Sequence, residues 1–391
     1  MLLGLIIIYF LAYVWSNNRK NIRYKNLIII LIVQVILAKF MLSTSIGINI
    51  INYVNKCFEI LLDSTRIGVS FVFGNLANTK EFIFFFNAAM PIVVMSVVIG
   101  ILQYFRVLQF LVVVIGSILS KVTGMGKLES FNAVSSLSVG QSENFLYYKK
   151  IIKYLPSNVL YTTAMSTVSI GTAVAYMTII DSSCVCIAIM MNMFGAFFVL
   201  NIINPYEKTK EVTYKFLTDQ VEDYETGRQS FFEMLSEYLL DGFKIAVIVC
   251  AMLIGFIALL NLVDSIFQEI LGITFRQILG YIFYPIAWVL NIHGNEIFLS
   301  SQIMGTKIFT NEFVAMQELA KNSQQLSEHT KAVVSVFLVS FANFSSIGII
   351  VGAVQALNKE ASIKVARFSL KILYGAVLVS ILSACVVGFI V

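Results

Sequence analysis

Long apolar runs alternate with short basic loops along most of the chain, and this pattern predicts a series of membrane-spanning helices. Lysine and arginine gather in some of these loops, which indicates that those loops lie in the cytoplasm. Residues 48–82 mix charged and apolar positions, as helices at a membrane interface do. We therefore expect eight spans with both ends of the chain on the outer side, at residues 2–15, 27–41, 82–104, 158–180, 184–203, 245–262, 331–350 and 368–391.

Two further segments are predicted to enter the membrane and return to the side from which they came. Residues 128–155 carry basic residues at both ends and the polar sequence Gly140-Gln141-Ser142-Glu143 between them, so both ends are expected in the cytoplasm. Residues 275–320 are interrupted at 291–296 and end in Asn311-Glu312. We expect this second hairpin to enter from the outer side.

Each predicted hairpin is followed by a span that polar residues break, at 166–172 in one copy and at 343–346 in the other. In secondary transporters such inverted repeats place the substrate between the broken helices, near the middle of the membrane. The predicted fold class is thus an all-α polytopic membrane protein with eight transmembrane helices and two opposed re-entrant hairpins forming an inverted repeat. The expected units are scaffold and interfacial helices over 1–127, the first hairpin with its broken span and the next helix over 128–203, a cytoplasmic loop and scaffold helix over 204–264, the second hairpin with its broken span over 265–355, and a C-terminal helix over 356–391.

Composition excludes several classes of protein. With 58% hydrophobic and 13% charged residues, the 391-residue chain has too little charge to cover a soluble surface. The net charge of +5 lies mostly in short loops, so we expect no nucleic-acid partner. Two histidines and scattered cysteines do not provide a metal site, and we expect no cofactor. An intramembrane enzyme would need paired aspartates or a metal cluster, so we predict that the chain is not an enzyme.

The polar residues in the apolar runs can bind a hydrophilic solute. Gln141 offers both a donor and an acceptor, which suits the edge of a nucleobase. Glu143 and Glu312 can accept hydrogen bonds from hydroxyl groups, and a carboxylate inside a membrane is costly without a function. Asn343 and Ser346 are three positions apart on one helix face and could complete a clamp for a diol. A passive channel or a purely structural membrane protein remains an alternative at this point.

Three motifs resemble the signatures of the concentrative nucleoside transporter family, and the resemblance extends over essentially the whole chain. They are Gly140-Gln141-Ser142-Glu143, Asn311-Glu312-Phe313-Val314-Ala315 and Phe341-Ala342-Asn343-Phe344-Ser345-Ser346-Ile347-Gly348. The stretches 129–136 and 280–288 resemble the bacterial NupC-type branch in particular.

This resemblance implies a homotrimer whose protomers transport a nucleoside by an elevator-like movement of the hairpin domain. It also implies a role for each matching residue. Gln141, Ser142 and Glu143 would contact the base and Val174 would pack on it, while Glu312, Asn343 and Ser346 would hold the ribose hydroxyls and Phe341 would line the site.

The sequence departs from the sodium-coupled members of that family at one residue of the expected ion site. Those members place an asparagine at the position of Ser136. The other sodium ligands would be backbone carbonyls near Val139 and Ile170 and the Ser169 hydroxyl. A serine at position 136 removes an oxygen ligand on a longer arm, and Ser135-Ser136 resembles the proton-coupled branch. We therefore predict a proton-coupled importer of uridine-like nucleosides in a bacterial inner membrane, with sodium coupling as the alternative.

Proton coupling needs a group that takes up and releases a proton during transport. Glu143 is the first candidate for this role and Glu312 the second.

Overall fold

The computed structural model describes residues 2–77, 83–137, 141, 144–145, 152–171, 176–177, 179–206 and 230–391, and within these residues it contains helices and no strand. The helices of the N-terminal part are α1 (Leu2–Val14), α2 (Tyr24–Ser43), α3 (Ser45–Phe73), α4 (Met90–Tyr104), α5 (Val107–Thr123), α6 (Lys127–Ser135), α7 (Ser157–Ile170) and α9 (Ser182–Ile203). Those of the C-terminal part are α11 (Phe231–Leu271), α12 (Phe275–Val289), α13 (Glu296–Phe309), α14 (Glu312–Lys321), α15 (Glu328–Leu338), α16 (Phe344–Leu357), α17 (Lys359–Arg367) and α18 (Ser369–Ile390).

The predicted all-helical architecture is confirmed. Among the described residues, six helical segments are long and apolar enough to cross a membrane: Tyr24–Ser43, Ser45–Ala77, Phe85–Tyr104, Ser182–Ile203, Ile254–Leu271 and Ser369–Ile390. Helix α1 is apolar but has only 13 residues, as the short first run indicated. The span predicted over 331–350 is divided between α15 and α16, and within the span predicted over 158–180 helix α7 ends at Ile170.

Two helices differ in length from the prediction. The interfacial region expected over residues 48–82 contains one continuous helix of 29 residues, α3, which also meets the length and composition of a span. Helix α11 has 41 residues, far more than the crossing predicted over 245–262. A capping box formed by Ser230 and Glu233 begins α11, and Gly272 in the left-handed region ends it.

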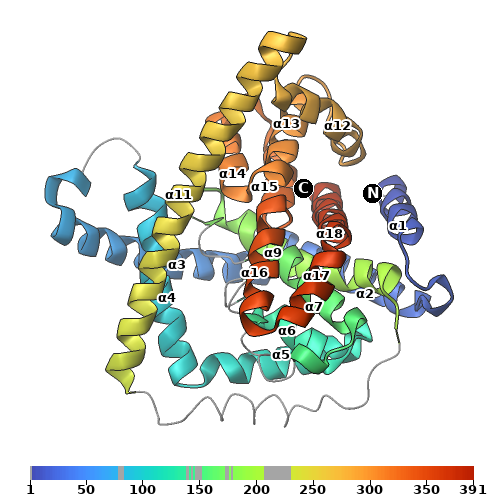
Figure 1. Ribbon diagram of the computed structural model, residues 1–391, viewed down its shortest axis with the longest axis horizontal. Coiled ribbons are helices and arrows are strands. Elements are labelled where there is room, and N and C mark those ends of the chain that lie inside the picture. The colour runs from blue at the N-terminus through green and yellow to red at the C-terminus, as the bar shows by residue number, and fades with distance from the viewer. Residues whose placement is uncertain are drawn as a thin grey trace.

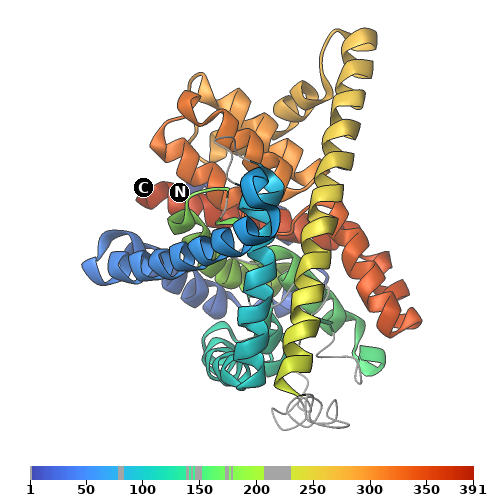
Figure 2. The same ribbon diagram turned by 90° about the vertical axis from the view of Figure 1, so that its left-hand side faces the viewer.

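The helices pack into one large core and one smaller body. Helices α7, α9, α15 and α18 contribute about half of the large core, and α9 and α18 contact one another extensively. Helix α4 packs along α11, and both views show these two helices together at one side of the molecule (Figures 1 and 2). Val69, Ala89, Met90 and Ala246 form a separate hydrophobic cluster there.

The same order of elements occurs twice in the chain. Helix α5 precedes α6, a polar stretch and the broken span that starts with α7, and α9 follows. In the second copy α12 precedes the α13–α14 hairpin and the broken span α15–α16, and α18 follows. The second copy matches the predicted hairpin followed by a broken span, whereas parts of the first predicted hairpin and of its broken span lie outside the described residues.

The second hairpin region contains two turns. The predicted interruption at 291–296 is present, because α12 ends at Val289 and α13 begins at Glu296, with Asn291 and Gly294 at positive φ. The polar motif lies at the second turn, where Asn311 has extended backbone and its side chain accepts a hydrogen bond from the Val314 N–H at 3.0 Å. The polar tip of this hairpin therefore lies between α13 and α14.

Candidate functional site

Glu312 is buried at the start of α14 and receives hydrogen bonds from two other elements. Its carboxylate accepts from the Asn343 side chain at 2.6 Å and from the Tyr176 hydroxyl at 3.1 Å. Asn343 belongs to the break between α15 and α16, and Tyr176 lies beyond the break that follows α7. The tip of the second hairpin thus meets the broken regions of both repeats at one carboxylate.

Helix termini support this arrangement. Asn343 caps α16, since its side-chain oxygen accepts from the Ser346 N–H at 2.8 Å while its nitrogen donates to Glu312. Glu312 lies in the first turn of α14, where the positive end of the helix dipole favours a carboxylate. The predicted residues Glu312, Asn343 and Ser346 are therefore brought together, and their polar groups suit a solute that carries hydroxyls.

Aromatic side chains cover the same position. The Tyr176 ring lies 5.4 Å from the Phe313 ring and 6.1 Å from the Phe341 ring, measured between centroids. Phe341 is 8% exposed and was predicted to line the site. These three rings form an apolar wall beside the Glu312 carboxylate, which suits a planar ring.

Lys307 is a fully buried lysine in the last turn of α13, close to Glu312. Its ammonium donates to Ser340 Oγ at 2.8 Å, to Ser380 Oγ at 3.2 Å and to the Phe337 carbonyl at 3.3 Å, and it lies 4.9 Å from the centre of the Phe337 ring. It also interacts electrostatically with Glu312. Lys307 therefore connects the hairpin to the end of α15, to the break after it and to α18, while balancing the buried carboxylate.

Ser136 lies in a second buried polar cluster, between α6 and α7. Its hydroxyl donates to the Asn132 carbonyl at 2.7 Å and lies 3.4 Å from Thr167 Oγ1. Ser169, predicted as a sodium ligand together with Ser136, donates to the Met165 carbonyl of its own helix at 2.7 Å. Ile170 ends α7 with its side chain buried, directly before the break.

Of the remaining predicted site residues, Gln141 belongs to the described part of the chain. The side-chain oxygen of Gln141 is buried and has no hydrogen-bond partner among the described residues. Ser142, Glu143, Val174 and Val139 lie outside the described residues. Within the described part of the chain, no group of three or more His, Cys, Asp or Glu side chains could hold a metal ion.

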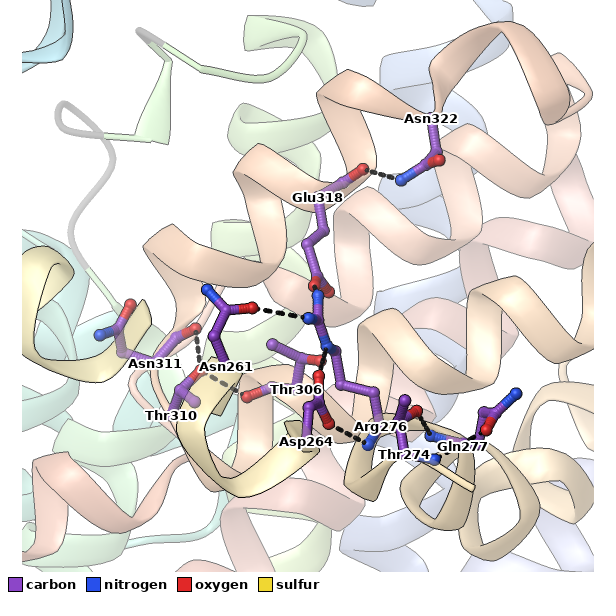
Figure 3. Close-up of polar contacts among 10 residues, drawn as sticks. All are labelled: Asn261, Asp264, Thr274, Arg276, Gln277, Thr306, Thr310, Asn311, Glu318 and Asn322. Carbon is purple, nitrogen blue, oxygen red and sulfur yellow. Dashed lines mark hydrogen bonds and ion pairs between the residues drawn. The ribbon is translucent and has the colours of Figure 1, made fainter. Parts of the chain in front are cut away.

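A separate ionic cluster joins α11 to the second hairpin region (Figure 3). Arg276 in α12 pairs with Asp264 of α11 and with Glu318 of α14, the latter at 2.9 Å, and also donates to Asn261 at 2.9 Å. A cleft of about 260 Å³ opens beside this cluster, lined in part by Arg276, Glu318 and Asn322. The cluster therefore connects the α4–α11 pair to the hairpin that carries Glu312.

Tyr176 and Lys307 contact or neighbour Glu312, although the sequence analysis did not single them out. A signal was present for Lys307, because it is the one charged residue between Glu296 and Glu312 in an otherwise mostly apolar stretch. Tyr176 carried no such signal, since a tyrosine in a membrane protein is common at helix ends and interfaces.

Comparison with known families agrees with the position of these motifs. The family model described as "Na+ dependent nucleoside transporter C-terminus" matches residues 184–388, the corresponding N-terminus model matches residues 3–76, and a model described as "Nucleoside recognition" matches residues 85–197.

Individual relatives match over nearly the full length. The purine nucleoside transport protein NupG of Bacillus subtilis is 31% identical over 395 residues, covering 100% of this chain and 98% of NupG. The nucleoside permease NupC of Helicobacter pylori is 25% identical, covering 98% of this chain and 96% of NupC. The solved structure of CNTnw in an inward-facing substrate-bound state superimposes with a TM-score of 0.93 at 26% identity, covering 100% of this chain and 96% of CNTnw.

Proposed function

The chain belongs to the concentrative nucleoside transporter family, and we propose that it is a proton-coupled symporter that imports nucleosides across a bacterial inner membrane. As a member of this family it is a membrane transporter and not an enzyme. The observation that carries the proposal is the buried contact between Glu312 and Asn343, which joins the second hairpin to a broken span. A sodium-coupled symporter of the same fold is the alternative.

The proposed ribose site consists of Glu312, Asn343 and Ser346. A carboxylate with an adjacent amide and hydroxyl can accept from and donate to two neighbouring hydroxyl groups of the sugar. Phe341 would line the site, and the Tyr176 and Phe313 rings beside it supply an apolar wall. This combination discriminates against solutes without hydroxyls, because such solutes would leave the buried polar groups without partners.

The proposed base site consists of Gln141, Ser142 and Glu143 at the tip of the first hairpin, with Val174 packing on the base. Support comes from the Gln141 side-chain oxygen, a buried acceptor without a partner among the described residues. An amide offers both a donor and an acceptor, so it can pair with the edge of either base class. We use uridine as the first probe substrate and a purine nucleoside as the second, since the relative NupG is named as a purine nucleoside transporter.

Proton coupling is favoured by the environment of Ser136. The other predicted sodium ligands are Val139, Ser169 and Ile170, but the described contacts of Ser136 go to Asn132, Asn144 and Thr167, and those of Ser169 stay within α7. Glu143 is the first candidate for the proton-carrying group and Glu312 the second. Glu143→Gln should therefore abolish the pH dependence of uptake, whereas unchanged concentrative uptake and pH dependence would contradict the assignment of Glu143.

Transport would proceed by an elevator-like movement within a homotrimer, with both termini on the outer side. The separate hydrophobic cluster of the α4–α11 pair supports a division into a static part and a moving part. The two termini lie near one another in both views (Figures 1 and 2). Trp15, just after the end of α1, stacks on Tyr374 near the start of α18 at 4.7 Å between ring centroids. The two helices therefore run in opposite directions, which supports a common side for both chain ends.

Uptake of labelled uridine into proteoliposomes, with a proton gradient or a sodium gradient imposed separately, tests this function. Accumulation driven by the proton gradient alone is the expected result. Accumulation that requires sodium would establish the alternative. Absence of uptake of both uridine and a purine nucleoside under either gradient would contradict the proposed substrate class.

A further inference from the structure

Asn144 is a fully buried asparagine whose side-chain nitrogen lies at the centre of several oxygens. The nitrogen is 2.8 Å from Ser136 Oγ, 2.9 Å from Asn132 Oδ1, 3.0 Å from Thr167 Oγ1 and 3.3 Å from the Asn132 carbonyl. These oxygens come from α6, from the residue after it and from α7. One nitrogen therefore holds the first hairpin against the first half of its broken span.

The orientation of the Asn144 side chain follows from its neighbours. Its oxygen accepts a hydrogen bond from the Ser135 hydroxyl at 2.5 Å, which directs the nitrogen to the opposite side. The Ser136 hydroxyl donates to the Asn132 carbonyl, and the Thr167 hydroxyl donates to the Thr163 carbonyl. Both hydroxyl oxygens therefore turn lone pairs toward Asn144.

An arrangement of four oxygens around one point is the arrangement that binds a small cation. The distances are those of N–H···O hydrogen bonds, longer than the roughly 2.3–2.6 Å at which a hard cation such as Ca²⁺ binds oxygen. An amide nitrogen carries only two hydrogens, so it cannot saturate four acceptors at once. The cluster therefore offers more acceptor oxygens than the two hydrogens of Asn144 can bind. The nitrogen lies at the point that a cation bound by these oxygens would occupy.

We propose that the Asn144 side-chain nitrogen takes the place of a bound sodium ion, so that the first hairpin is held to α7 without sodium. The inference rests on the proposed function, because it gives a structural reason for coupling to protons alone. Of the sodium ligands predicted from the sequence, this cluster contains Ser136, and it adds Asn132 and Thr167. Sodium and the Asn144 amide are then mutually exclusive occupants of the same oxygen cluster. Removing the amide should create a sodium site that the wild-type protein does not have.

Thermal unfolding of the purified full-length protein in sodium chloride and in choline chloride at equal ionic strength tests this inference. The wild-type midpoint should be the same in both salts. Asn144→Ala leaves the oxygens without a donor, so its midpoint should be lower in choline chloride and should rise by several degrees in sodium chloride, because a ligand that binds only the folded state stabilises it. Adding Ser136→Ala to Asn144→Ala should remove most of this sodium response.

Asn144→Asp is a second variant that keeps the size and shape of the side chain. One of its carboxylate oxygens would take the place of the nitrogen, so a sodium ion remains excluded and the midpoint should fall below that of the wild type equally in both salts. Asn192→Ala is the matched control, because Asn192 is also fully buried and donates to a backbone carbonyl, that of Val339. Its midpoint should fall equally in both salts.

The outcomes separate this inference from the proposed function. A folded Asn144→Ala protein without any sodium response overturns the inference, while proton-driven uptake by the wild type leaves the function intact. Failure of Asn144→Ala to fold even in sodium chloride also overturns it, since sodium should replace the amide. Sodium-driven uptake and sodium stabilisation of the wild type would overturn both.

Discussion

The side-chain nitrogen of Asn343 lies 2.6 Å from a carboxylate oxygen of Glu312, although 31 positions separate the two residues along the chain. Glu312 starts α14 and Asn343 caps α16, so this contact exists only when the second hairpin packs against the second broken span. A nucleoside hydroxyl that binds Glu312 must share or replace this hydrogen bond. In the proposed site, one pair of side chains would therefore couple substrate binding to the packing of the hairpin.

Glu312→Gln should weaken nucleoside binding without unfolding the protein. The glutamine keeps the shape of the side chain and can still accept from Asn343, but it lacks the charge that strengthens a hydrogen bond to a hydroxyl. Losing a charge-assisted hydrogen bond costs about 1.5–3 kcal/mol, which corresponds to a loss of affinity of about 10- to 150-fold. Equilibrium binding of labelled uridine, together with the unfolding midpoint, measures both effects.

Glu318→Gln on the same helix serves as the control for that experiment, because Glu318 pairs with Arg276 and has no described contact with Asn343. Its affinity for uridine should remain within about twofold of the wild type, a difference of less than ~0.5 kcal/mol. Equal losses of affinity in both variants would show that Glu312 acts through the stability of α14 and does not contact the substrate.

Lys307→Met should destabilise the fold and reduce transport together. It would remove the ammonium that bonds Ser340, Ser380 and the Phe337 carbonyl, and it would leave the Glu312 carboxylate buried without its balancing charge. Removing a charged donor from a buried site costs about 1–3 kcal/mol. Thermal unfolding and uridine affinity of the purified variant measure the loss.

The matched control for this prediction is Lys331→Met. Lys331 pairs with Glu328 at 2.8 Å on an exposed part of α15, and such a surface pair contributes at most ~1 kcal/mol. If Lys307→Met is as stable as Lys331→Met and binds uridine normally, Lys307 only fills space in the hairpin.

Gly171→Ala should destabilise the contact between the residues that follow α7 and those that follow α15. Gly171 has φ +76° and ψ 164°, a conformation that residues with a side chain rarely adopt, and it follows the last residue of α7. A Cβ at this position would lie 3.2 Å from the Ser340 Cα and 3.2 Å from the Tyr176 ring. The backbone strain alone costs about 1–3 kcal/mol, so we expect a lower unfolding midpoint and weaker uridine binding.

Gly352→Ala is the comparison for this substitution. Gly352 lies inside α16 with nothing within 4 Å of an added Cβ, so alanine should be neutral or stabilising by about 0.5–1 kcal/mol. A Gly171→Ala protein that matches Gly352→Ala in stability and binding would contradict the idea that the two breaks must approach this closely.

The sequence could predict which residues form the site better than it could predict their partners. Glu312, Asn343 and Ser346 were recognisable because polar groups inside apolar runs must find partners, and the structure does bring them together. The role of Tyr176 depends on how the first broken span crosses the second hairpin, which no local pattern encodes. Ser136 illustrates the same limit, because no local pattern indicated that the Asn144 side chain would donate to its hydroxyl.

Arg276→Gln should weaken the connection between α11 and the second hairpin region. The guanidinium pairs with Asp264, which is only 6% exposed, and with Glu318, so its removal leaves a nearly buried carboxylate without a charged partner. Breaking a fully buried ion pair costs about 3–5 kcal/mol, but a third of the Arg276 side chain is exposed, so we expect a smaller loss of about 1–3 kcal/mol.

A double-mutant cycle with Asp264→Asn separates the pair from the general effect of each change. If the pair itself is responsible, the double variant should be no less stable than Arg276→Gln alone, because the carboxylate that would remain unpaired is gone. Additive losses would contradict this account and would assign the effect to the other contacts of Arg276, with Glu318 and Asn261. Unfolding midpoints of the four proteins, measured at low and high salt, decide between these results, since the part of the interaction that reaches the surface should be screened by salt.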